Sequence, residues 1–162
     1  MTEIKYVTGD ATDPQVEGKK LIIHICNNVG AWGAGFVLAL SKKWKQPEES
    51  YRLMSSYDLG TIDYVTVEDD IAVCNMIAQE NIRGRDKSSK LPPIRYIALE
   101  YALKQIVHSN TLLEISGSGN TFSIHMPRIG SGLAGGNWNI IEAIIKETLC
   151  KAGIEVTVYD LV

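Results

Sequence analysis

The sequence predicts a three-layer α/β domain in which helices cover both faces of a central mixed, mostly parallel β-sheet. Residues 20–26 form a nearly continuous apolar run, which is typical of a strand buried on both faces. Strand-like and helix-like segments alternate along the chain, as they do in folds built on parallel sheets. The length of 162 residues suits one well-packed core, so we assign residues 1–162 to a single domain.

The first elements follow from local patterns. Residues 3–8 alternate and stop at a Gly-Asp pair, which predicts an edge strand followed by a turn. Residues 36–45 carry apolar side chains spaced four apart, which predicts a helix. A proline at the start of 47–57 suits the first turn of a second helix. The β-rich runs 62–67 and 71–78, joined by an acidic turn, predict a hairpin.

The middle of the chain combines a polar segment with a long helix. Residues 81–92 are rich in charged and structure-breaking residues, so they are the best candidate for a mobile surface loop. The pattern that follows predicts a helix over about 94–108. In such a helix Ile94, Ile97, Tyr101 and Val107 would lie near one face.

The last elements alternate in the same way. The polar residues 116–120 lead into a predicted strand over 121–129. An amphipathic helix over 140–153 comes next, and Gly153 is well placed to end it in a left-handed conformation. The closing strand is expected at 154–161.

Charge and hydropathy narrow the classes of function. The net charge is −3 and there is no basic stripe to neutralise phosphates, so broad nucleic-acid binding is not expected. No apolar run is long enough for a membrane span, and the N-terminus does not resemble a signal peptide. We therefore expect a cytoplasmic protein that does not associate with membranes.

Metal and cofactor chemistry is not expected either. Cys26, Cys74 and Cys150 are too scattered for a zinc site, and their odd number argues against a disulfide framework. We expect all three to be small buried hydrophobic residues. The sequence contains no H-E-x-x-H motif, no Walker-type phosphate loop and no aspartate cluster, so we predict no metal and no cofactor.

Two glycine-rich stretches, at residues 30–36 and 130–136, are the clearest candidates for a binding site. Each lies between a predicted strand and a helix, where ligands bind at the carboxyl end of an open sheet. Glycines let the backbone approach an anion closely, and N–H groups there are free to bind it. A flexible crossover without a ligand is the alternative, but two such stretches favour one diphosphate held from both sides.

The second stretch also matches the dinucleotide-binding pattern G-x-G-x-x-G at Gly130, Gly132 and Gly135. The chain ends at Val162 soon afterwards, so we do not expect the second half of a dinucleotide-binding fold. The pattern then indicates a phosphate or another anion at a helix N-terminus.

His24 is the candidate catalytic residue. Strand alternation places it on the same face as Ile22 and Cys26, a few residues before the first glycine-rich stretch. It could be a hydrogen-bonded core histidine, or it could act as a general acid or base beside a bound phosphate. The other strand histidine, His125, is expected to be structural.

Four segments of the sequence resemble the macro-domain family, whose members bind ADP-ribose. They are YVTGDAT at residues 6–12, the stretch 24–36, the stretch 126–138 and VTVYDL at 156–161. The resemblance covers essentially the whole chain and is nearest to the ADP-ribose-1″-phosphate phosphatase branch. Terminal ADP-ribose protein glycohydrolases are the next nearest branch. The resemblance implies a macro-domain fold with ADP-ribose as the ligand.

The resemblance also implies a role for each matching residue. Asp10 would accept a hydrogen bond from the adenine amino group, Ala11 would offer backbone contacts, and Tyr159 would lie against the adenine ring. Asn27 or Asn28 would contact the distal ribose hydroxyls. The first loop would wrap the distal ribose and part of the diphosphate with Gly33, Ala34, Gly35 and Phe36. The second loop would hold the diphosphate at Ile129, Gly130, Ser131, Gly132, Leu133 and Ala134.

The same resemblance separates the possible reactions. A histidine at the position of His24 is implicated in catalysis in the phosphatase branch. The glycohydrolase branch uses a lysine and an aspartate where this chain has Gln79 and Ala134, so that mechanism is not expected. We expect hydrolysis of the phosphate of ADP-ribose 1″-phosphate. The alternatives are a non-catalytic reader of free or macromolecule-linked ADP-ribose, and a de-ADP-ribosylating hydrolase with another residue set.

Overall fold

The computed structural model describes residues 1–82, 91–115 and 121–161, without the side chains of 114 and 115. Most of the predicted loop 81–92 and the polar stretch 116–120 lie outside the described residues. The strands are β1 Ile4–Thr8, β2 Lys20–Asn27, β3 Ile62–Glu68, β4 Ile71–Gln79, β5 Ser123–Pro127 and β6 Val156–Asp160. The helices are α1 Phe36–Lys43, α2 Gln46–Arg52, α3 Tyr96–Ile115 and α4 Trp138–Ile145, with α4 followed by a π-helical turn at Lys146–Cys150.

The six strands form one mixed sheet in the order β1-β6-β5-β2-β4-β3. Every neighbouring pair is parallel except β3 and β4, which form the predicted antiparallel hairpin at one edge. β1 lies at the other edge, as the alternation of residues 3–8 predicted. The predicted fold class, a helix-covered and mostly parallel sheet, is therefore confirmed.

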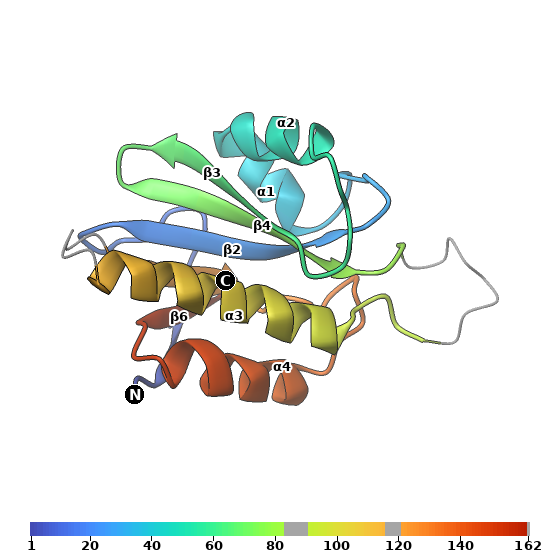
Figure 1. Cartoon of the computed structure of the whole chain (residues 1–162). Helices are drawn as coiled ribbons and strands as arrows, with labels where there is room; N and C mark the ends of the chain where they lie inside the picture. Colours follow the sequence, from blue (N-terminus) through green and yellow to red (C-terminus); the bar gives the residue numbers. More distant parts are fainter. Residues whose placement is uncertain (83–90, 116–120, 162) are drawn as a thin grey trace.

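Helices cover both faces of the sheet, with α1 and α2 on one side and α3 and α4 on the other (Figure 1). The buried strand β2 divides its side chains between the two layers. Leu21 and Ile23 join the core under α3 and α4, while Ile22 and Cys26 join the core under α1 and α2. The apolar run in β2 exists because both faces of this strand are covered.

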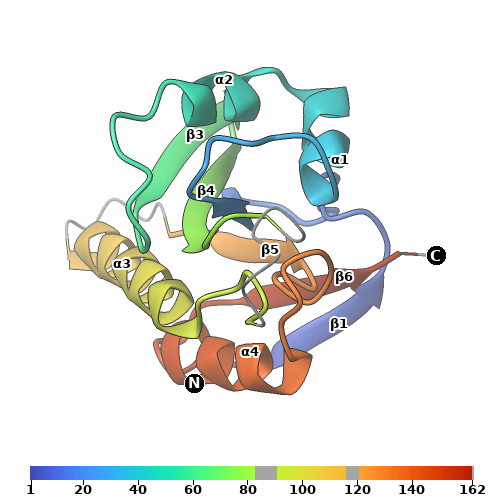
Figure 2. The same ribbon diagram turned by 90° about the vertical axis from the view of Figure 1, so that its right-hand side faces the viewer.

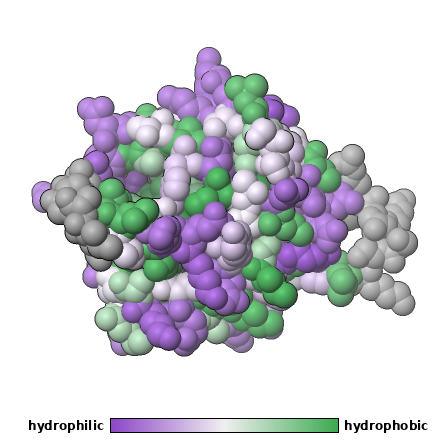
Figure 3. Space-filling model, viewed as in Figure 1, coloured by the Kyte–Doolittle hydropathy of each residue, from purple (hydrophilic) through white to green (hydrophobic). Residues whose placement is uncertain are grey.

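The face of α3 that carries Ile97 and Tyr101 does not pack on the core. Ile97 and Tyr101 are 85% and 60% exposed. The residues that face the core are instead Ala98, Leu99, Ala102, Leu103 and Ile106. Helix α3 carries two apolar stripes, and the one that contains two alanines is buried because small side chains let the helix approach the sheet closely. Figure 3 shows hydrophobic side chains scattered among polar ones on the molecular face that includes α3.

Several helix boundaries differ from the predictions. α2 ends at Arg52 rather than near 57, and α3 continues to Ile115 rather than ending near 108. The helix predicted over 140–153 begins at Trp138 and widens into the π-helical turn. Gly153 has the left-handed φ of 81° that was predicted for it. Within the described ranges, no helix is long and apolar enough to cross a membrane.

Candidate functional site

Two loops at the carboxyl end of the parallel strands form the candidate site. Loop 1 (residues 28–35) joins β2 to α1, and loop 2 (residues 128–137) joins β5 to α4. Because β2 and β5 are parallel neighbours, both loops leave the same end of the sheet. Figure 2 looks onto this end, with loop 1 in blue and loop 2 in orange.

Loop 2 is closed by hydrogen bonds of its own backbone. The amide of Gly136 donates to Gly130 O at 2.7 Å, and the amide of Gly135 donates to Gly132 O at 3.0 Å. Among the described residues, no acceptor is found for the amides of Gly132, Leu133 and Ala134. These N–H groups are available to an anion, as expected for a phosphate-binding loop.

The N-terminus of α4, where the sequence predicts an anion, is capped by a side chain in this structure. Asn137 caps this helix, because its side chain accepts a hydrogen bond from the amide of Asn139 at 2.8 Å. The amide of Asn137 donates to the hydroxyl of Tyr96 at 2.9 Å. An anion at loop 2 would therefore bind the loop amides rather than the first turn of α4.

Loop 1 is folded around the side chain of Asn27. Its Oδ1 accepts hydrogen bonds from the amides of Val29 and Ala31 at 3.1 and 3.0 Å, and its Nδ2 donates to Ala31 O at 2.7 Å. Farther along the loop, in the described part of the chain, the amides of Gly33 and Ala34 donate to no protein acceptor. Both loops thus offer free N–H groups at the same end of the sheet.

Two adjoining cavities of about 320 and 210 Å³ lie between the loops. They share Ile25, Ala34, Val37, Gln79 and Leu133, so they form one cleft. The larger cavity is also lined by Cys26, Asn27, Ala31, Gly33 and Ile82. The smaller is also lined by His24, Gly35, Phe36, Pro127, Arg128, Ile129, Gly130, Gly132 and Ala134.

His24 lies at the wall of the smaller cavity and is almost completely buried, with 2% of its surface exposed. Its ring packs against the rings of Trp32 and Phe36. Its Nε2 lies 2.5 Å from Asn75 Oδ1. Asn75 Nδ2 donates to the backbone of Pro47 and to a carboxylate, so Asn75 Oδ1 must be the acceptor.

This contact fixes the protonation state of the His24 ring. Nε2 carries the proton that is donated to Asn75, which leaves Nδ1 as the acceptor of the neutral ring. Burial lowers the pKa of His24 to about 4, although the hydrogen bond to Asn75 raises it. At neutral pH the ring is therefore uncharged and can accept a proton on Nδ1.

Among the described residues that line the cleft, only Arg128 is charged. Its guanidinium binds both oxygens of Asp160 at 2.6 and 3.0 Å. The same group lies over the rings of Tyr6 and Trp138, at 5.0 and 5.3 Å from their centres. Its hydrogen bonds lower the pKa of Asp160. Arg128 is therefore already paired with a carboxylate, and the described part of the cleft offers backbone N–H groups to an anion.

Gln79 ends β4 and lines both cavities, opposite Ala134 of loop 2. Its Nε2 donates to Asn81 O at 2.9 Å. The resemblance to glycohydrolases placed a lysine and an aspartate at these two positions. The cleft therefore contains an amide and a methyl group where those enzymes carry an amine and a carboxylate.

Asp10 and Tyr159 lie at the same end of the sheet, beyond the two cavities. The pairing of β1 with β6 brings them together, and the amide of Gly9 donates to Asp160 O at 2.8 Å. Asp10 Oδ1 accepts hydrogen bonds from the amide and hydroxyl of Thr12. Tyr159 is anchored below by a 2.7 Å hydrogen bond between its hydroxyl and His125 Nδ1.

The structure brings most of the predicted site residues to this cleft. Its walls include His24, Asn27, Gly33, Ala34, Gly35, Phe36, Ile129, Gly130, Gly132, Leu133 and Ala134. The residues that line neither cavity are Asp10, Ala11, Asn28, Ser131 and Tyr159. Asn28 instead accepts the amide of Asn81 at its Oδ1, and Ser131 donates to Arg128 O.

Gln79, Ile82 and Arg128 were not predicted as site residues. Gln79 could have been found, because it directly follows a buried strand and thus lies at the carboxyl end of the sheet. The sequence carried no comparable sign for Ile82 or Arg128.

Solved structures identify the class of protein that this fold and cleft define. No family model matches the chain. A macrodomain protein from Streptomyces coelicolor is 43% identical with a TM-score of 0.80, and the match covers 98% of this chain and 99% of that one. A protein of unknown function from Bacteroides thetaiotaomicron is 51% identical with a TM-score of 0.88, over 99% of each chain. This chain belongs to the macrodomain family.

More distant relatives have names that point to ADP-ribose. An ADP-ribose 1″-phosphate phosphatase from Lodderomyces elongisporus is 25% identical, over 88% of this chain and 90% of that protein. The Thermosipho africanus DarTG structure in complex with ADP-ribose shares the fold, with 16% identity and a TM-score of 0.71 over 100% of this chain and 42% of that one.

One relative is much longer than this chain. The chromodomain-helicase-DNA-binding protein 1-like of Danio rerio is 32% identical over 98% of this chain. The chain spans 16% of the length of that protein.

Proposed function

We propose that the cleft between loops 1 and 2 binds ADP-ribose. The observation that carries this proposal is that both loops line one cleft and both offer backbone N–H groups without protein acceptors. The diphosphate binds the amides of loop 2, with Ser131 at its outer side. Adenine lies between Asp10 and Tyr159, with Ala11 beside it. The distal ribose then reaches loop 1, Asn27 or Asn28, and Gln79.

The finer proposal is hydrolysis of ADP-ribose 1″-phosphate. Water attacks the phosphorus, the bond between phosphorus and the C1″ oxygen breaks, and ADP-ribose and inorganic phosphate are released. His24 accepts a proton from the attacking water on Nδ1, the acceptor atom of its neutral ring. Two observations support this reaction: His24 shares a cavity with both loops, and a phosphatase matches along most of its own length.

A non-catalytic reader of ADP-ribose is the second candidate. It is favoured by the deep burial of His24, which is 2% exposed and hydrogen-bonded to another buried side chain. Such burial is typical of a histidine that helps to build the wall of the cleft and takes no part in a reaction. A glycohydrolase that uses a lysine and an aspartate is disfavoured by the residues present at Gln79 and Ala134.

One experiment separates these candidates. ADP-ribose binding is measured by calorimetry, and release of inorganic phosphate from ADP-ribose 1″-phosphate is followed for the wild type, His24→Ala and His108→Ala. His108 is exposed on α3, so its variant is the control. We expect His24→Ala to lower the rate by about 100-fold or more, and the control to match the wild type. Binding without phosphate release would leave the reader, and absence of ADP-ribose binding would overturn both.

A further inference from the structure

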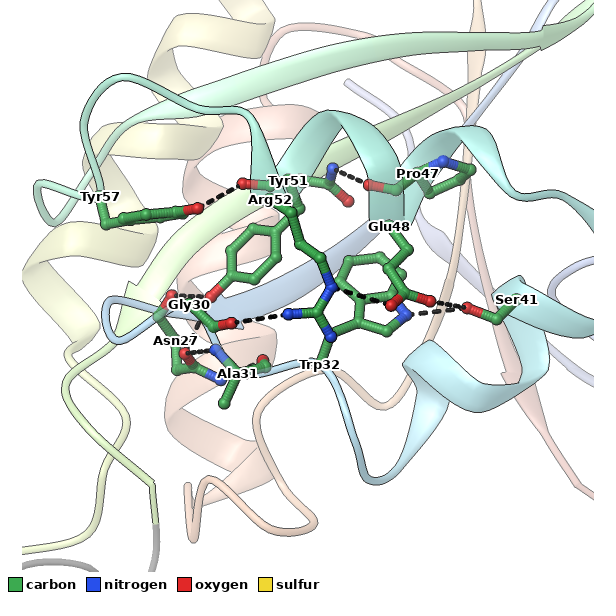
Figure 4. Close-up of polar contacts among 11 residues, drawn as sticks. Asn27, Gly30, Ala31, Trp32, Ser41, Pro47, Glu48, Tyr51, Arg52 and Tyr57 are labelled. Atoms are coloured by element: carbon green, nitrogen blue, oxygen red, sulfur yellow. Dashed lines mark hydrogen bonds and ion pairs between the residues drawn. The ribbon is translucent and has the colours of Figure 1, made fainter.

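Tyr51 of α2 packs against loop 1 and reaches Asn27, at the start of the loop, with its hydroxyl group. The side chain has no exposed surface, and its ring packs against the rings of Trp32 and Tyr57. The hydroxyl donates to the backbone oxygen of Asn27 at 2.6 Å and to Asn27 Oδ1 at 2.8 Å (Figure 4). Burial raises the pKa of Tyr51, so the hydroxyl keeps its proton and remains a donor.

This contact supports the atom around which loop 1 is folded. Asn27 Oδ1 is the acceptor for the amides of Val29 and Ala31 as well as for Tyr51. The amide group of Asn27 is therefore oriented by Tyr51 of α2, and it in turn orients the start of loop 1. If the hydroxyl were removed, the backbone oxygen and Oδ1 of Asn27 would both lose their contact with this donor. Water could not easily replace it, because the site is buried.

A second connection joins the middle of loop 1 to α1 and α2. Arg52 Nη1 donates to Gly30 O at 3.3 Å, and Arg52 Nε pairs with Glu48 Oε2 at 2.9 Å. Ser41 donates to the other oxygen of Glu48 at 3.2 Å and accepts a hydrogen bond from Trp32 Nε1 at 2.8 Å. Figure 4 shows these side chains linked in one chain from Gly30 to Trp32. Loop 1 is therefore supported along its length by two helices.

The place of loop 1 in the cleft gives this support a consequence for binding. With adenine at β1 and β6, the opposite end of ADP-ribose lies over β2 and β4, where loop 1 and Gln79 line the cavity. A loop that already has its bound shape binds without the cost of being ordered. The contact between Tyr51 and Asn27 should therefore affect mainly the binding of the part of the ligand that touches loop 1.

We propose that Tyr51 is a positioning residue that holds Asn27 and loop 1 in the shape that receives the distal ribose of ADP-ribose. This inference rests on the proposed function. A Tyr51 with a purely structural role stabilises the fold without changing which ligand is preferred. A positioning Tyr51 strengthens the binding of ADP-ribose much more than that of ADP, because ADP has no distal ribose.

The test compares the affinities for ADP-ribose and ADP in the wild type, Tyr51→Phe and Tyr64→Phe. Tyr64 is the matched control, because its hydroxyl donates to Ser109 on the surface, away from loop 1. We expect Tyr51→Phe to weaken ADP-ribose binding by about fivefold to tenfold and to change ADP binding by less than about twofold. Faster hydrogen exchange of the Val29 and Ala31 amides in the free protein should accompany this loss. Tyr64→Phe should leave the ratio of affinities unchanged.

Two results for Tyr51→Phe would overturn the inference: an equal loss of affinity for both ligands, or a lower melting temperature with unchanged affinities. If this variant does not fold, Arg52→Ala takes its place, because Arg52 is half exposed and its removal opens only the second connection. It should weaken ADP-ribose binding selectively by about twofold to threefold, and an unchanged affinity ratio would overturn the inference. A wild-type protein that binds neither ligand would instead overturn the proposed function, and the inference with it.

Discussion

The two glycine-rich loops have similar compositions but keep their shapes by different means. Loop 1 depends on side chains, since Asn27 fills its first turn and Tyr51 and Arg52 of α2 hold it from outside. Loop 2 is closed by its own backbone, through the hydrogen bond between Gly136 and Gly130. A glycine-rich pattern alone therefore does not tell which residues keep a binding loop in shape.

Loop 2 contains a tightly packed glycine, Gly136, beside an open one, Gly132, whereas no glycine of loop 1 is packed as closely as Gly136. A Cβ atom at Gly33 of loop 1 would meet nothing within 4 Å. A Cβ atom at Gly136 of loop 2 would lie 2.5 Å from Gly130 O and 2.9 Å from Ile141. Gly136 is thus required for close packing, whereas Gly33 leaves an open surface for a ligand.

The largest expected effect tests this contrast directly. Gly136→Ala should lower the free energy of unfolding by about 3 kcal/mol, because the new methyl group would overlap a backbone oxygen that cannot move freely. Gly33→Ala should change it by less than about 0.5 kcal/mol. Urea unfolding of both variants measures the difference. Equal stabilities for the two variants would contradict the distinction between the loops.

A second expected effect concerns the strands that lead into the loops, because each carries a buried histidine. Burial lowers the pKa of His24 and of His125 to about 4, from an ordinary value of 6.5. Below pH 6.5 the unfolded chain takes up protons that the folded protein does not, so stability falls as the pH drops toward 4.

At pH 5 each histidine should account for a loss of about 2 kcal/mol relative to pH 7. Urea unfolding at both pH values should show a smaller loss for His125→Gln and for His24→Gln than for the wild type. If only one variant reduces the loss, only the strand before that loop carries an acid-sensitive histidine. A wild-type stability that is flat from pH 7 to 5 would show that neither pKa is lowered.

The smallest expected effect is at the start of loop 2, where Arg128 connects the loop to Asp160, Tyr6 and Trp138. Because loop 2 is closed by its own backbone, Arg128→Ala should change the affinity for ADP by less than about twofold. Calorimetry checks this expectation. A loss as large as that of Tyr51→Phe for ADP-ribose would mean that the contacts of Arg128, and not only the loop backbone, keep the start of loop 2 in shape.

Features set by residues close together in the sequence could be predicted. The apolar run of β2, the acidic turn between β3 and β4, and the glycines of both loops each determine local structure or burial directly. The parallel order of β2 and β5 then followed from the alternation of strands and helices, and it placed both loops at one end of the sheet.

Features set by distant partners could not be predicted in this way. The sequence suggested Asn27 as a ligand contact. In the structure Asn27 instead folds the start of loop 1 and is itself held by Tyr51, whose position depends on how α2 packs. The buried stripe of α3 could not be chosen from the sequence, because exposed Ile97 is as apolar as the residues that do face the sheet. Which stripe of α3 is buried depends on how closely the helix packs on the sheet, and the stripe with the alanines allows the closer approach.

The position of β6 in the sheet also determines the order in which the cleft can form. β6 comes last among the six strands along the chain, yet it lies between β1 and β5 and is the strand that β1 pairs with. β1 precedes the other five strands in the chain, but it can join the sheet only after β6 is available to pair with it. Asp10 follows β1 and Tyr159 lies in β6, so the end of the cleft proposed for adenine is built from segments far apart in the sequence and forms late.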